Sequence, residues 1–127
     1  MASAIDTSTF IEGVLKMTKP TMQQLQTRVD EYIGQFKEGY FPPFEMLARL
    51  SEELGELSRE VQHVHGQKKK KATEAKSNMA EELGDFFFVL ICFANSQGIA
   101  MDEALDKVLH KFETRDKDRW TRKDEDN

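Results

Sequence analysis

Residues 77–98, SNMAEELGDFFFVLICFANSQG, contain the longest apolar run of the chain. The run FFFVLICFA is apolar on every side of a helix, and Gly98 follows it closely. A buried strand is the rival interpretation, but the strong helix formers MAEELGD lead into the run without a turn. The sequence therefore predicts a helix over about 77–97, capped by Ser77 or Asn78, as the central and most buried element.

Three further helices are expected around this one. Apolar residues recur three and four positions apart over about 21–37, 43–65 and 100–115. The pair Pro42–Pro43 and the residue Gly66 interrupt the pattern between helices. No segment alternates between apolar and polar residues as a half-buried strand does. The predicted class is all-α, a four-helix bundle-like module.

The chain of 127 residues is the size of one domain. Residues 1–18 are expected to form either a tail or a short docking helix, and 19–127 a single helical domain with a charged C-terminal tail. The lysine-rich segment QKKKKATEAKS at 67–77 is interpreted as a solvated connection. Trp120 interrupts the charged tail and is expected to pack on a neighbouring element.

The composition excludes several classes of function. With 18 Lys and Arg against 23 Asp and Glu, the net charge is −5, which argues against binding to a nucleic acid polymer. No apolar run is long enough to span a membrane, and the first residues lack a signal pattern. A lone cysteine, Cys92, excludes an internal disulfide and a cysteine-based zinc site. We expect a cytoplasmic protein without a membrane partner.

Two matched acidic motifs are the informative feature of the sequence. EELGE occupies 52–56 and EELGD occupies 81–85. Helix positions three apart lie about 60° apart on one face, so each motif presents one pair of carboxylates. The first pair is Glu53 with Glu56. The second is Glu82 with Asp85, and it runs directly into the apolar segment, which predicts buried or half-buried positions for both.

Four carboxylates beside a core would repel one another unless a cation neutralised them. Oxygen ligands without His or Cys suit Mg²⁺, and Mn²⁺ is possible. Solvated surface glutamates are the ordinary interpretation of one such motif, but two motifs on successive helices favour a metal site. Gly55 and Gly84 each cost a helix about 0.5–1 kcal/mol relative to Ala, which predicts close helix–helix approach at the acids.

The motifs resemble the signature of the MazG-like nucleotide pyrophosphohydrolases, in which EExxE is followed after a loop by ExxD. The segment LHKFETR at 109–115 is similar to the KFxxR element of that family. The overall pattern is similar to its short single-domain branch. Many relatives carry Asn at the position of Leu109, so the phosphate contact of that Asn has no counterpart here.

The resemblance implies a helical module that cleaves nucleoside triphosphates, with ribose or deoxyribose, to monophosphate and pyrophosphate, in nucleotide-pool sanitation. It implies a homo-oligomer, tetramer or dimer, with the site near a subunit interface. Lys111 and Arg115 would contact phosphate, and Glu52, which is left over from the metal set, is the candidate to orient water. Mg²⁺ would be held by four acids: Glu53, Glu56, Glu82 and Asp85.

Two other classes of function stay open at this point. A di-iron carboxylate oxidase would carry Glu-x-x-His on two helices, but the chain has only Glu60-x-x-His63, and His63 is expected at the surface of a helix end. A non-catalytic helical oligomer would use its acids only for solubility.

Overall fold

The computed structural model describes residues 18–67, 69–71 and 78–124. The segment predicted to be a tail or a docking helix therefore lies outside the described residues, apart from Thr18. Four helices are present: α2 (Met22–Ile33), α3 (Pro43–His65), α4 (Met79–Ser96) and α5 (Met101–Thr114). No strand occurs in the described ranges, and the all-α prediction is confirmed.

The helix ends follow from local sequence. Thr21 and Gln24 form a reciprocal capping box at the start of α2, and the Asn78 side chain accepts a hydrogen bond from the amide of Glu81 at the start of α4. The predicted extension of the first helix to residue 37 is wrong. α2 ends at Ile33, and the amides of Gln35 and Phe36 bond three residues back in turns instead.

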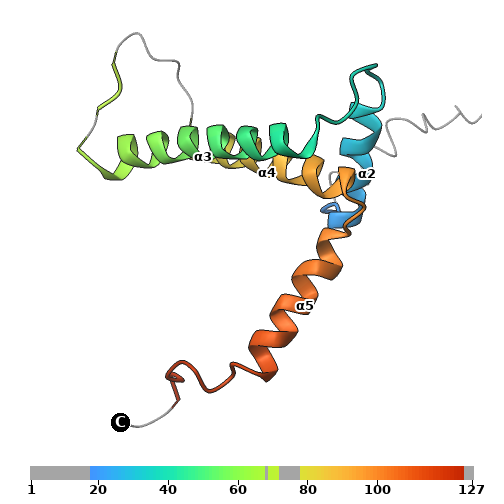
Figure 1. Ribbon diagram of the computed structural model, residues 1–127. Helices are drawn as coiled ribbons and strands as arrows, with labels where there is room; N and C mark the ends of the chain where they lie inside the picture. The colour runs from blue at the N-terminus through green and yellow to red at the C-terminus, as the bar shows by residue number, and fades with distance from the viewer. Residues whose placement is uncertain (1–17, 68, 72–77, 125–127) are drawn as a thin grey trace, which may run out of the picture.

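The acid-bearing helices α3 and α4 lie side by side and form the main packing of the chain (Figure 1). α2 packs on the C-terminal part of α4, and α5 packs on α2 while leaving the α3–α4 pair. The axes of α4 and α5 are bent by 100° relative to one another. α5 therefore extends away from the α3–α4 pair rather than along it.

The core is small and centred on α4. The buried apolar residues of the described chain are Met46 of α3 and four residues of α4, Val89, Ile91, Cys92 and Ala94. This confirms α4 as the central helix. Many large apolar side chains stay exposed on all four helices, among them Leu54 and Leu83 at 53% and 55%. One chain therefore leaves far more apolar surface open than a stable monomer usually does.

A polar network holds the corner between α4 and α5. Gln26 of α2 donates to the Asn95 side chain and to the Ile99 carbonyl, both at 2.9 Å, and its own carbonyl oxygen Oε1 accepts from the Met101 amide at 2.9 Å. Asn95 in turn donates to the Tyr40 hydroxyl at 3.0 Å. Because one side chain satisfies groups on both sides of the bend, the direction of α5 is fixed against α2.

The C-terminal tail differs from expectation. Trp120 is 76% exposed, and its ring contact is the Arg119 guanidinium at 5.4 Å from the ring centre. The expected packing on a neighbouring element is therefore wrong within the described part of one chain. Of the described helices, none is by itself long and apolar enough to cross a membrane, and only α4 and α5 together, across their bend, meet the length and composition.

Candidate metal and nucleotide site

The two acidic motifs meet where α3 and α4 pack together. Glu53, Glu56, Glu82 and Asp85 each bring one carboxylate oxygen into a group whose members lie within 4.8 Å of one another. We call this group the acid cluster. Its formation follows from the sequence: each motif places two carboxylates on one helix face, and the packing of the two helices turns both faces toward one another.

The cluster is graded from buried to exposed. Glu53 and Glu82 are half-buried, whereas Glu56 and Asp85 are exposed, so the burial expected for Asp85 is wrong. The Oε2 atoms of Glu53 and Glu82 are fully buried and have no hydrogen-bond partner among the described residues. Buried carboxylate oxygens without a donor are costly, and a proton or a bound cation would remove that cost.

The pKa of Glu53 also reflects the lack of a donor for its buried carboxylate oxygen. Burial raises its pKa above the ordinary glutamate value, and the nearby charges of Glu56 and Asp85 raise this pKa further. Arg49, whose Nη2 lies 3.9 Å from Glu53 Oε1, lowers it but does not compensate. The donor set is oxygen-only and negatively charged, which fits a hard divalent cation such as Mg²⁺ or Mn²⁺.

The glycines of the two motifs contradict the expectation that the helices approach each other closely at the acids. A Cβ built at Gly55 or Gly84 meets no atom within 4 Å, so neither glycine marks a close approach between helices of the same chain. Glu52 is exposed and does not belong to the acid cluster.

The candidate phosphate-binding residues lie apart from the acids in one chain. Lys111 and Arg115 are exposed at the C-terminal end of α5, the helix that diverges from α3 and α4 (Figure 1). Lys111 Nζ lies 5.3 Å from the centre of the Phe112 ring, and Arg115 pairs with Asp116 at 3.5 Å. The structure of one chain thus brings together the four acids and not the two cations.

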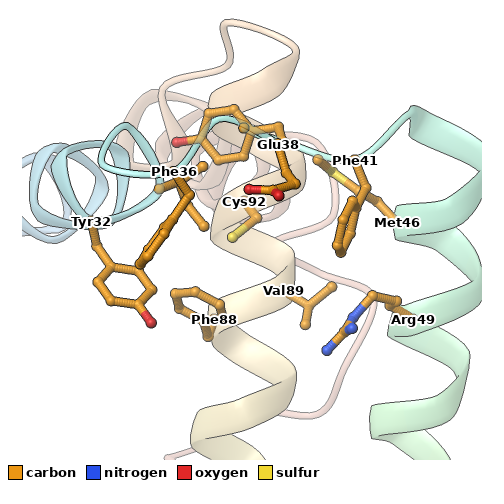
Figure 2. A pocket seen from close by; sticks show the side chains of 12 residues that line it. Tyr32, Phe36, Glu38, Phe41, Met46, Arg49, Phe88, Val89 and Cys92 are labelled. Carbon is orange, nitrogen blue, oxygen red and sulfur yellow. The ribbon is translucent and has the colours of Figure 1, made fainter.

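An aromatic cavity of about 340 Å³ opens beside the cluster, between α2, α4 and the start of α3. Figure 2 shows its side chains converging from these elements, with Arg49 on the side of α3. Glu38 and Arg49 are the charged residues of the lining. Its aromatic residues are Tyr32, Phe36, Tyr40, Phe41 and Phe88.

Two aromatic residues of the junction between α2 and α3, Phe36 and Tyr40, line the cavity. Phe44, at the start of α3, is 86% exposed and is not part of the lining. The residue that sequence reasoning missed is Arg49. Its position one helical turn before Glu53 on α3 was the available signal, because residues four apart share a helix face.

A second charged group lies toward the end of α3. Glu60 is 6% exposed, the Nδ1 of His63 lies 3.7 Å from its Oε2, and Lys70 Nζ lies 3.0 Å from the same oxygen. The expectation that His63 is a surface residue is wrong, since its side chain is only 4% exposed. The di-iron alternative gains nothing from this, because neither residue belongs to the acid cluster.

Comparisons with known proteins identify the family of the chain. The MazG nucleotide pyrophosphohydrolase domain matches residues 41–120, a range that includes both acidic motifs and the KFxxR element. The chain belongs to the MazG family of nucleotide pyrophosphohydrolases. This confirms the family predicted from the motifs.

The relatives include short proteins of the same build. The chain is 63% identical over 109 residues to the uncharacterized protein YpjD of Bacillus subtilis, covering 86% of this chain and 98% of YpjD. The crystal structure of YpjD has a TM-score of 0.70 at 60% identity, over 76% of this chain and 99% of that one. A Bacillus-conserved MazG protein, described as a nucleotide pyrophosphohydrolase, has a TM-score of 0.67 at 52% identity, over 78% and 96%.

Proposed function

We propose that this MazG-family chain hydrolyses nucleoside triphosphates to nucleoside monophosphate and pyrophosphate, with Mg²⁺ as its cofactor and Mn²⁺ as the possible substitute. The observation that carries the proposal is the acid cluster: four carboxylates within 4.8 Å, two of them with buried oxygens that have no donor within the described ranges. A triphosphate is the anion that a cation held there would attract and neutralise.

The residues of the cluster have different roles in the proposed reaction. Glu53 and Glu82 supply the buried oxygens, and the exposed acids Glu56 and Asp85 close the set from the solvent side. When bound, the metal ion would polarise a phosphoryl oxygen and offset the negative charge of the transition state. Glu52, exposed beside the cluster in sequence, is our candidate to orient the attacking water.

The nucleoside is expected to occupy the aromatic cavity next to the cluster. A volume of about 340 Å³ is at the lower end of small-molecule pockets, and aromatic walls offer stacking surface to a base of any identity. With the nucleoside there and the outer phosphates beyond the cluster, the α-phosphorus falls next to the carboxylates. Attack on it by water releases pyrophosphate, and the fate of the attacking oxygen identifies the step.

The homo-oligomer is part of this proposal. Lys111 and Arg115 lie on the diverging α5, and exposed apolar side chains cover α3 and α4. We propose that a second copy, in a dimer or a tetramer built from dimers, covers this apolar face and supplies both cations to the outer phosphates. Surplus apolar surface of this extent usually marks an interface.

Hydrolysis in ¹⁸O-labelled water tests the proposed reaction. A panel of natural and modified nucleoside and deoxynucleoside triphosphates is incubated with protein and Mg²⁺, and the products are resolved by mass spectrometry. We expect label in the monophosphate together with unlabelled pyrophosphate. Inorganic phosphate with accumulating diphosphate would contradict the proposal, and an unchanged melting temperature with Mg²⁺ and nucleotide would favour a non-catalytic oligomer.

A further inference from the structure

Arg49 lies on the border between the acid cluster and the aromatic cavity. It belongs to the lining of the cavity, and its Nη2 is 3.9 Å from Glu53 Oε1 in the cluster. It is the only cation among the described residues that line the cavity. Figure 2 shows its side chain reaching from α3 toward Val89 on the wall of the cavity.

The contacts of the guanidinium leave most of its donors available. Its ion pair with Glu53 is long, and its ring contact places Cζ 5.8 Å from the centre of the Phe41 ring. No hydrogen bond and no second ion pair of Arg49 is present in the described chain. The side chain of Arg49 is 48% exposed, so the head group is open to a ligand from solvent. A guanidinium has five N–H donors in a fork that matches two oxygens of one phosphate.

We propose that Arg49 binds the α-phosphate of the substrate and stabilises the charge that develops on its oxygens during cleavage. This inference rests on the proposed function. If the nucleoside fills the cavity and the cluster serves the phosphates, the α-phosphate is the group that must cross the border where Arg49 lies. Electrostatic stabilisation at the reacting phosphorus is the main contribution that a protein makes to phosphoryl transfer.

The ion pair with Glu53 also links Arg49 to cation binding in the acid cluster. Once Glu53 donates its oxygens to a cation, the carboxylate has less charge left to hold the guanidinium. Arg49 can then turn toward the phosphate without losing a strong partner, because the 3.9 Å contact is already weak. Arg49 therefore connects occupation of the cluster to recognition of the nucleotide.

Binding of the product isolates the contact from turnover, because a monophosphate has no anhydride bond to cleave. In MgCl₂, calorimetry gives the affinities of adenosine, guanosine, cytidine and uridine, and of their 5′-monophosphates, for the wild type, Arg49→Ala and Arg59→Ala. Arg59 is the matched control, since it is exposed on the same helix and does not line the cavity. We expect the affinity for monophosphate relative to nucleoside to fall at least about tenfold in Arg49→Ala alone, as loss of a charge-assisted contact predicts.

Kinetics with α-thiotriphosphates supply the second measurement. The wild type should discriminate between the Rp and Sp isomers of adenosine 5′-O-(1-thiotriphosphate), and Arg49→Ala should reduce that discrimination while lowering kcat on the oxygen substrate by about 100-fold. Arg49→Lys, which keeps the charge and loses the fork, should lie between the two. A purely structural role would leave the preference between isomers unchanged.

The outcomes separate the two proposals. An active wild type whose Arg49→Ala variant keeps both the monophosphate ratio and the isomer preference overturns the role of Arg49 and leaves the proposed function intact. A wild type that releases no pyrophosphate from any triphosphate overturns both. Circular dichroism melts of Arg49→Ala and Arg49→Lys check that a loss does not come from unfolding.

Discussion

Replacing Glu53 by Gln should stabilise the protein without metal and destabilise it with metal, relative to the wild type. In the wild type the cluster oxygens lie within 4.8 Å of one another. At that separation two unit charges repel by about 0.9 kcal/mol in bulk water and about 3.5 kcal/mol at an effective dielectric constant of 20. Because Glu56 and Asp85 are exposed, the lower part of this range applies to them.

The net effect on the metal-free chain follows from these values. Removing the charge of Glu53 relieves its repulsion from Glu56 and Asp85 and the cost of its burial, and it loses the weak pair with Arg49. We expect a gain of about 1–2 kcal/mol in the free energy of unfolding, or roughly 3–8 °C in melting temperature for a domain of this size. The gain should shrink in high salt, which screens exposed charges.

Metal reverses the order of the two proteins. A ligand present at 100 times its dissociation constant stabilises the folded state by about 2.7 kcal/mol, and only the wild type keeps all four ligands. In 10 mM MgCl₂ the wild type should therefore melt above Glu53→Gln, and the variant should lose turnover while keeping its helix content. Asp85→Asn should lose turnover in the same way.

Thermal melts followed by circular dichroism, in EDTA and in MgCl₂ at one protein concentration, measure both effects. Glu52→Gln is the matched control, because Glu52 is exposed and outside the cluster. It should shift neither the metal-free melt nor the response to Mg²⁺. Destabilisation of Glu53→Gln in EDTA, or a response to Mg²⁺ as large as that of the wild type, would refute the assignment of the cluster as a metal site.

Three further predictions concern pH and assembly. The pKa of Glu53 is raised in the folded protein, so protonation of Glu53 stabilises the metal-free fold at low pH. That stability is lost as the pH rises through the raised pKa. The difference in melting temperature between Glu53→Gln and the wild type should therefore vanish near pH 4 and grow toward pH 7. Light scattering at micromolar concentration should give an oligomer that Leu54→Glu or Leu83→Glu dissociates, whereas a monomeric wild type would contradict this. Mixing inactive Lys111→Ala and Asp85→Asn proteins should restore part of the activity, and no recovery after subunit exchange would place Lys111 outside the partner's site.

The local features of the fold were predictable because they depend on local chemistry. Helical spacing, the capping residue Asn78 and the breaks at Pro42–Pro43 and Gly66 determine three of the four helices to within about two residues. The first helix was predicted to end too late because Phe36 continues the apolar spacing. Gly34 ends α2, and the Phe36 side chain packs edge to face on Tyr32 in the turn that follows.

The site was predictable where it depends on one helix face, and not where it depends on packing. Spacing alone pairs Glu53 with Glu56, but only the contact between α3 and α4 shows that the second pair reaches the same 4.8 Å group. The burial of Asp85 was mispredicted because a position just before an apolar run need not be buried: within the first two turns of α4, Glu82 is half-buried and Asp85 is exposed. Arg49 was missed because a lone arginine has no pattern until the cavity beside it is known.

The open glycines of the two motifs favour the proposed homo-oligomer, because nothing within one chain explains them. Each cluster motif contains an exposed leucine followed by a glycine that faces open space, Leu54–Gly55 on α3 and Leu83–Gly84 on α4. Glycine costs a helix stability, and that cost is offset only if another backbone approaches closely. A second copy packed on these positions would bury the two leucines and exclude water beside the acids. Lower polarity there would strengthen both the repulsion among the carboxylates and their attraction to a cation, so metal binding and assembly should favour one another.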